Sequence, residues 1–103
     1  QSVADEVLKA SKDSGEPFWQ LPMWPELTKE TKGSFGDLKN IAKGSVKAGS
    51  IMGAMFLREF TGDTKWAHLD IAATGWNCQA TGYAGTGGSG YGVRTLVQSC
   101  LNK

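Results

Sequence analysis

Apolar residues recur at helical spacing in three stretches of the chain, 3–12, 48–60 and 92–101. The last stretch shows the pattern most fully, with apolar positions at Val93, Leu96, Val97, Cys100 and Leu101. Ser2 can cap the first stretch, and Gly15 follows it as a helix stop. We predict helices over these three ranges, and we expect the apolar face of the last one, including Cys100, to be buried.

The segment EPFWQLPMWPEL, 16–27, connects the first helix to the middle of the chain. Its three prolines exclude a central strand, because proline cannot donate a hydrogen bond to a sheet. We therefore expect an extended connection, followed by a short helix from Glu26 to about Lys32 that starts after Pro25.

Two segments of the chain are strand candidates. KWAHLDIAA, 65–73, is apolar enough for a strand buried on both faces. DLKNI, 37–41, is a second candidate, and a glycine-rich loop covers 75–92. With the helices, these segments predict an α/β fold, a partial mixed sheet flanked by helices. Gly49 and Gly53 lie four residues apart, so we also expect a flat groove on the middle helix where another backbone comes close.

The motif GTGGSG, 85–90, has the G-x-G-x-x-G spacing of a dinucleotide-binding loop. Such a loop follows a strand directly, opens a helix of a βαβ unit and is followed by an acidic residue about 20 positions on. Here the motif starts about a dozen residues after the expected strand, and no acidic residue occurs after Asp70. We interpret it as a flexible glycine loop.

Length and charge narrow the function classes. A chain of 103 residues suits one small domain, 1–103, and its net charge of +1 gives no electrostatic case for binding nucleic acid or an anionic membrane. No run approaches the roughly 18 apolar residues of a membrane span. The start, QSVADEVLK, has no signal-peptide pattern. Because the initial Met is absent, we expect either a piece of something longer or a start produced by processing.

One histidine raises the question of a catalytic triad. Trp66, His68 and Asp70 alternate onto one face of the expected strand. A nucleophile such as Ser89 or Cys78 would have to come from the loop. Residues two apart on a strand are roughly 6.5–7 Å apart at the backbone, so a direct His–Asp bond is not automatic. We interpret His68 as a buried structural histidine beside a structural aspartate.

Other candidate sites are incomplete. The sequence has no H-E-x-x-H, no C-x-x-C and no carboxylate cluster, so no complete metal centre is predicted. Lys39, Lys43 and Lys47 are spaced by four, and a solvated stripe is favoured over a phosphate site. Cys78 and Cys100 are expected to be free thiols, because no disulfide framework is present.

Three ordered blocks, AGSIMGAMFL, WAHLDIAATGW and GSGYGVRTLV, resemble the C-terminus of the leucyl aminopeptidases, the cytosol aminopeptidase family of two-metal exopeptidases. The stretch EPFWQLPMWPELTKETKGSFGDLKNI resembles the region that precedes these blocks. The resemblance covers about Ser2 to Leu101. It implies that 1–103 is the C-terminal portion of a metal-dependent aminopeptidase catalytic domain.

The resemblance implies a cytoplasmic full-length enzyme that removes N-terminal residues from peptides with two divalent cations, zinc or manganese. It also implies contact with the rest of the catalytic domain and assembly into a homo-oligomer, a hexamer. The family motif N-T-D-A-E-G-R, which carries some of the metal ligands, does not occur here. We therefore assign no catalytic and no metal-ligating residue to this chain, and we expect it to be inactive alone.

By match of the D-I-A block, Ala72 and Gly75 fall on positions that line the family's pocket for the substrate's N-terminal side chain. Small residues there would leave room for a large apolar side chain. Alternatively, Ala72 and Ala73 are small only because a buried strand end is crowded.

A second function class stays open, a stand-alone non-catalytic interaction module derived from that fold. Such a module would use the exposed aromatic and glycine-groove surfaces. Four aromatic residues lie where a complete catalytic domain would cover them, so we expect the isolated chain to self-associate or to fold only marginally: Phe18, Trp19, Trp24 and Trp76.

Overall fold

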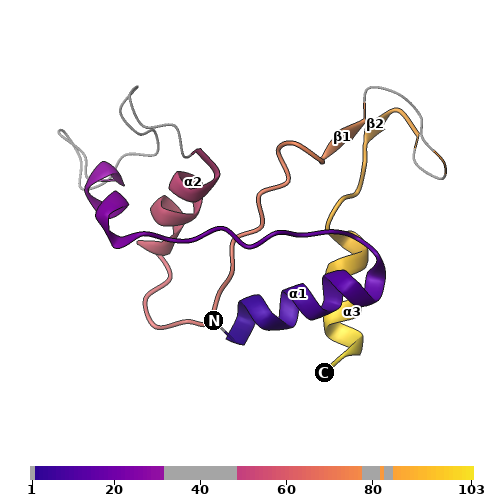
Figure 1. The fold of residues 1–103 in the computed structure, drawn as a ribbon, viewed down its shortest axis with the longest axis horizontal. Helices are drawn as coiled ribbons and strands as arrows, with labels where there is room; N and C mark the ends of the chain where they lie inside the picture. The colour runs from indigo at the N-terminus through magenta and orange to yellow at the C-terminus, as the bar shows by residue number, and fades with distance from the viewer. Residues whose placement is uncertain (1, 32–48, 78–81, 83–84) are drawn as a thin grey trace. The chain divides into compact units, whose positions relative to one another are not determined.

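The computed structural model describes residues 2–31, 49–77, 82 and 85–103 and divides into two compact units. One unit joins the described residues up to Gln20 with those from Leu69 onward, so it contains both ends of the chain. Figure 1 shows its two helices, α1 and α3, packed beside each other. The other unit is Leu21–His68.

Helix α1, Ser2–Ser14, packs against α3, Val93–Leu101, through small and polar side chains. Ala10 and Thr95 have no exposed surface, so the two helices approach closely at these residues. Ser14 Oγ lies 3.3 Å from Thr95 Oγ1, and Asn102 Nδ2 donates to Asp13 Oδ2 at 3.1 Å. The contact is therefore largely polar along α3.

The end of α1 turns the chain back toward α3. Gly15 has a φ of 70°, the left-handed conformation that favours glycine. Its N–H donates to the carbonyl of Lys12 at 3.3 Å, and the N–H of Glu16 donates to the carbonyl of Ser11 at 3.1 Å. This pair of bonds is the Schellman arrangement, which satisfies carbonyls at the helix end and directs the next residue sideways.

The carboxylate of Glu16 is buried and caps the start of α3. Gly92, just before α3, offers no side chain for capping. Instead, Glu16 Oε2 accepts hydrogen bonds from the N–H of Thr95 at 3.0 Å and from its hydroxyl at 2.7 Å. A negative group at a helix start also matches the helix dipole. One side chain thus joins the two ends of the chain.

Burial alone would raise the pKa of the Glu16 carboxyl. The hydrogen bonds from the Thr95 side chain and from the backbone of Gly92 and Thr95, with the charge of Arg94, outweigh that effect and hold this pKa below its ordinary value. The carboxylate is therefore ionised where it caps α3.

The same unit holds the only sheet among the described residues. Strand β1, Trp76–Asn77, pairs antiparallel with β2, Gly87–Gly88, in the register Trp76 to Gly88 and Asn77 to Gly87. Gly87 has a φ of 106°, which a side chain would strain. The pair is a short hairpin at the base of the glycine-rich segment.

The second unit packs the 3-10 helix η1, Pro25–Thr31, against α2, Gly49–Arg58. Among the described residues of this unit, the buried side chains come from α2: Met52, Ala54 and Met55. Phe56 and Phe60 meet edge to face, with ring centroids 5.3 Å apart, at the end of the helix. No helix within the described ranges is long and apolar enough to cross a membrane.

The helix predictions are confirmed, and the strand prediction is wrong. The predicted helices at 3–12, 48–60 and 92–101 correspond to α1, α2 and α3. The short helix predicted from Glu26 corresponds to η1, which begins one residue earlier, at Pro25. Residues 65–71 form neither helix nor strand, and most of them are exposed. An apolar extended run becomes a strand only where a neighbour pairs with its backbone, and no described segment does so here. The second candidate, 37–41, lies outside the described residues.

The sheet differs from the predicted one for the same reason. An α/β character is present, but the described residues contain a two-stranded antiparallel sheet in place of a mixed one.

The orientation of α3 also differs from the prediction. Its polar side, with Thr95 and Asn102 seven residues apart, contacts α1, and its apolar side is exposed. Cys100 is a free cysteine as expected, but it is exposed. The pattern correctly located an apolar face, but it could not show which face the neighbouring helix would contact.

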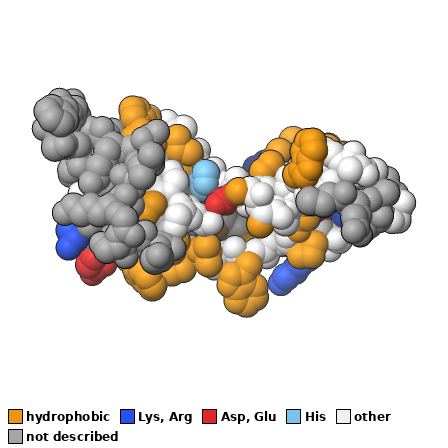
Figure 2. All heavy atoms as spheres, turned by 90° about the horizontal axis from the view of Figure 1, so that it is seen from above, with side chains coloured by type: hydrophobic (Ala, Val, Ile, Leu, Met, Phe, Trp, Pro, Cys, Tyr) orange, Lys and Arg blue, Asp and Glu red, His pale blue; other side chains and the backbone are white. Residues whose placement is uncertain are grey.

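Many hydrophobic side chains are exposed, as the orange atoms of Figure 2 show. The large ones with the greatest exposure are Trp19, Phe60, Trp76 and Leu101. Two exposed ion pairs, Lys9 with Asp13 at 2.5 Å and Lys103 with Glu6 at 2.6 Å, accompany α1 and α3. Such surface pairs contribute at most about 1 kcal/mol each, so they do not replace apolar burial.

No described backbone comes close to the predicted groove at Gly49 and Gly53. A Cβ on Gly49 would meet no described atom within 4 Å, and one on Gly53 would lie 3.6 Å from His68 Nε2, an ordinary contact. Among the described residues, no close neighbour of α2 therefore requires a glycine at either position.

We predict that Gly53→Ala stabilises the chain by about 0.5–1 kcal/mol, because alanine favours the helical backbone and its methyl group has room. Thermal unfolding followed by circular dichroism measures this, with Gly49→Ala at the helix start as the comparison. A lower melting temperature for Gly53→Ala would show that a neighbour does fill the space beside it.

We predict that Glu16→Gln destabilises the chain at pH 7 by about 1–3 kcal/mol, because a neutral amide replaces a charged buried acceptor. The folded-state pKa of Glu16 is lowered, so its contribution is complete above the ordinary pKa and is lost as pH falls through the folded value. The difference in melting temperature should therefore shrink on acidification from about pH 6 to about pH 3. Glu26→Gln, an exposed carboxylate in η1, is the control, and a difference that grows toward low pH would contradict the capping role.

Candidate functional site

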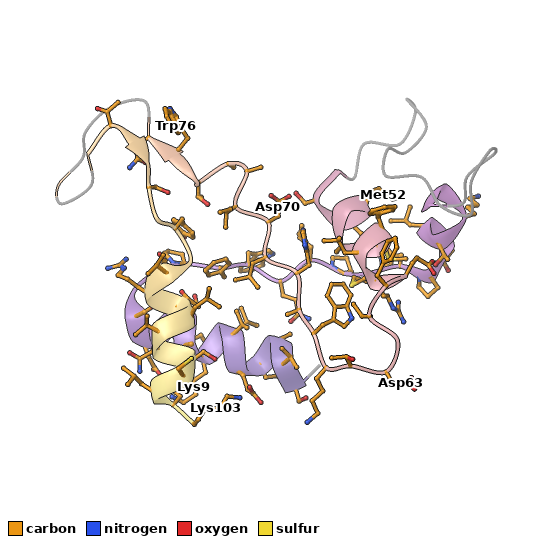
Figure 3. The ribbon with its side chains drawn as sticks, turned by 180° about the vertical axis from the view of Figure 1, so that it is seen from behind. Lys9, Met52, Asp63, Asp70, Trp76 and Lys103 are labelled. Atoms are coloured by element: carbon orange, nitrogen blue, oxygen red, sulfur yellow. The ribbon has the colours of Figure 1, made fainter. Side chains whose placement is uncertain are left out.

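The segment 70–75 folds into a closed turn that positions Ala72. Asp70 Oδ1 accepts a hydrogen bond from the N–H of Ala72 at 2.9 Å, an Asx turn. The carbonyl of Ile71 then accepts from the N–H of Thr74 at 3.1 Å and from that of Gly75 at 2.6 Å. Figure 3 labels Asp70 before this turn and Trp76 after it.

Ser89 ties this turn to the hairpin. Its N–H donates to the carbonyl of Gly75 at 3.0 Å, and its hydroxyl donates to the carbonyl of Thr74 at 2.5 Å. Its Oγ also accepts from the N–H of Tyr91 at 3.2 Å. The Ser89 hydroxyl, a possible nucleophile by sequence, thus joins two segments of backbone, the turn and residues 89–91.

Gly75 is required by the backbone itself. A Cβ at this position would lie 2.9 Å from the carbonyl oxygen of Ile71 and 3.5 Å from its Cδ1. The first distance is shorter than a real Cβ contact, so any side chain would open the turn. This local reason for a glycine exists whether or not a substrate binds nearby.

Ala72 has a different environment. It is exposed, as are Ile71, Ala73 and Thr74. The alternative explanation for a small residue, a crowded buried strand end, does not apply within the described residues. A methyl group on a rigid and open turn leaves room for an apolar ligand side chain. Both predicted pocket residues therefore lie in one turn, but only Ala72 is exposed.

The suggested triad is not supported by the local contacts. The carboxylate of Asp70 bonds the backbone of its own turn. His68 is half-buried, and its Nε2 lies 3.6 Å from the position of a Cβ on Gly53, in the unit of α2. His68 thus lies beside α2, and it is half-buried where a buried histidine was predicted. Cys78 lies outside the described residues, as do Lys39, Lys43 and Lys47.

Across the part of the chain that the structure describes, no three His, Cys, Asp or Glu side chains gather in a way that could hold a metal ion. The described residues thus do not fit the two-cation centre that the resemblance implies, and no chemical step is assigned to a metal here. The turn can present a small apolar surface to a ligand. The backbone N–H groups beside that surface are already hydrogen-bonded.

Sequence comparisons match most of this chain to one protein family. The profile of the family described as "Cytosol aminopeptidase family, catalytic domain" matches residues 1–97. A "Probable cytosol aminopeptidase" of Geobacter sp. (strain M21) is 43% identical over 103 residues, which are 100% of this chain and 21% of that protein. Proteins of the same name match from Synechocystis sp. (strain ATCC 27184 / PCC 6803 / Kazusa), 44% identical over 98% of this chain, and from Clostridium tetani (strain Massachusetts / E88), 46% identical over 91%.

The chain spans about a fifth of the length of these curated relatives. The match lies in their C-terminal part. The turn 70–75 falls inside the matched region, as do α1, α2 and the hairpin.

We predict that Gly75→Ala loosens the turn, because the new methyl group collides with the carbonyl of Ile71. Overpacking of this kind costs about 1–3 kcal/mol, so hydrogen exchange at the Ser89 amide should speed up by roughly 5- to 150-fold. Gly88→Ala is the matched control, since no described atom lies within 4 Å of its added methyl. Equal exchange rates in both variants would show that the turn tolerates a side chain at Gly75.

Proposed function

This chain belongs to the cytosol aminopeptidase family, and from that premise we propose that it supplies the C-terminal part of the catalytic domain in a peptide-hydrolysing aminopeptidase. Its role in that enzyme is to line the pocket for the substrate's N-terminal side chain. Ala72 gives the pocket its open apolar surface, and Gly75 gives the turn its shape. The observation that carries this proposal is the exposed Ala72 on a turn fixed by Asp70 and Ser89.

A rigid turn suits this role because a pocket selects side chains only if its walls stay in place. The N–H groups of Ala72, Thr74 and Gly75 all donate hydrogen bonds within the turn. Asp70 Oδ1 accepts the first bond, and the carbonyl of Ile71 accepts the other two. The substrate side chain would then meet carbon atoms, and these three N–H groups would keep their hydrogen bonds. Such a surface favours an apolar N-terminal residue over a charged one.

In this proposal the chemistry belongs to the rest of the catalytic domain. That part holds the two divalent cations, zinc or manganese, which supply an activated water when bound. The chain alone is inactive, and the complete enzyme is a cytoplasmic homo-hexamer that acts on peptides. The names of the relatives, probable cytosol aminopeptidases, support the activity and the compartment.

The direct test combines this chain with the rest of a relative's catalytic domain. A chimera carries the Geobacter relative with its matching C-terminal stretch replaced by residues 1–103. We expect the chimera to hydrolyse leucine p-nitroanilide with added manganese and to lose that activity when a chelator is added. The isolated chain should show no hydrolysis. Hydrolysis by the isolated chain would overturn the assignment of the chemistry to the rest of the domain, and a folded but inactive chimera would overturn the family role.

In that chimera we predict that Ala72→Leu lowers kcat/KM for leucine p-nitroanilide by about 10- to 200-fold, the range for extra methylenes in an apolar pocket. Hydrolysis of alanine p-nitroanilide should fall less, since its methyl group needs less room. Ala73→Leu, the next exposed residue of the same turn, is the control. An unchanged ratio of leucine to alanine hydrolysis in Ala72→Leu would show that Ala72 does not line the pocket.

A stand-alone interaction module remains the second candidate, and the exposed aromatic side chains favour it. Trp19 is 88% exposed and Trp76 is 67% exposed. Aromatic residues in such positions are common in protein interfaces. A cooperatively melting monomer that does not bind a hydrophobic dye, together with an inactive chimera, would favour this candidate.

A further inference from the structure

The apolar side of α3 forms a continuous exposed surface, which we call the α3 stripe. It consists of Val93, Leu96, Val97, Cys100 and Leu101. The four large members are 58%, 55%, 54% and 73% exposed in that order, and Cys100 is exposed as well. Their spacing of three and four residues places them on one side of the helix.

The exposure of this stripe follows from how α3 is held. Thr95 is fully buried against Glu16 and Ser14, and Asn102 bonds Asp13. These contacts direct the polar side of α3 at α1, so the stripe on the opposite side points away from the helix pair. α3 thus contributes its polar side to its own unit, and its apolar side is uncovered by the described residues of that unit.

Leaving these side chains in water forgoes a substantial stabilisation. Full burial of one Val or Leu side chain is worth about 1.5–3 kcal/mol. A contiguous apolar patch on a protein surface usually marks an interface. The stripe contains no charged residue, so its partner surface must be apolar too.

We propose that the α3 stripe is the docking surface for the preceding part of the same catalytic domain, and that it is covered in the complete enzyme by an apolar surface of that part. This inference rests on the proposed function, in which the chain acts within a complete aminopeptidase. The family match extends to residue 97, so it runs into the stripe, and about four fifths of each relative lies outside the matched region.

The size of the stripe favours this occupant over a second copy of the chain. A nine-residue helix is about 13.5 Å long. A stable dimer takes about 20–30 residues and roughly 800 Å² from each partner, whereas the stripe offers five residues. A contact this small is effective when both surfaces belong to one polypeptide, because the translational and rotational cost of association is then absent.

The test measures how fast Cys100 reacts with iodoacetamide in the chimera described above. Its other cysteines are replaced by serine, including Cys78. A second form of the chimera carries Cys100→Ser and Lys12→Cys, which places the only thiol on the exposed side of α1. Sedimentation at each protein concentration reports the assembly state, and hydrolysis of leucine p-nitroanilide is read separately.

We expect Cys100 to react at least about tenfold more slowly than the thiol at position 12, because reactivity follows exposure of the thiolate. The protection should be the same in monomers and oligomers. Leu96→Gln with Val97→Gln should lower the melting temperature of the chimera and restore the reactivity of Cys100, whereas Lys12→Gln should change neither.

Equal rates at the two thiols would overturn the proposal, because the stripe would then be uncovered in the complete domain. Protection that disappears when oligomers dissociate into monomers would also overturn it and would identify a second copy as the occupant. A protected Cys100 in an inactive chimera would preserve this inference while contradicting the proposed function, so the two failures are distinguishable.

Discussion

The carboxylate of Glu16 determines how the two ends of this chain meet. It is buried, it accepts two hydrogen bonds from Thr95, and it caps a helix whose own preceding residue is glycine. A buried carboxylate needs donors, and a helix start needs acceptors, so the two requirements satisfy each other. The Schellman turn at Gly15 is what directs Glu16 toward α3.

The residues that follow Glu16 extend this connection to the candidate pocket. Ser11 Oγ donates to the carbonyl of Glu16 and accepts from the N–H of Phe18. Phe18 meets the ring of Tyr91 edge to face at 5.4 Å, and the Tyr91 hydroxyl donates to the carbonyl of Pro17. The backbone of Tyr91 in turn bonds Ser89, which ties the turn 70–75. The turn 70–75 is therefore supported by contacts that begin in α1.

This arrangement gives the chain a defined turn whose shape is set by contacts within one unit. Backbone hydrogen bonds within one unit fix the shape of the turn at Ala72 and Gly75. The same unit leaves the α3 stripe exposed, and the second unit leaves Leu57 and Phe60 exposed. The contacts between α1 and α3 are therefore largely polar, and large apolar side chains are exposed in both units.

The sequence by itself determined the three helices, the glycine stop after α1 and the family, because helical periodicity, turn residues and ordered motifs are local properties. It also placed Ala72 and Gly75 together, through one short motif. It could not predict that 65–73 would lack strand pairing, since a strand depends on a partner distant in the chain. Nor could it show which side of α3 faces α1. The apolar side of α3 was the obvious candidate for burial, but the tertiary structure buries Thr95 instead, because the carboxylate of Glu16 requires the donors on that side.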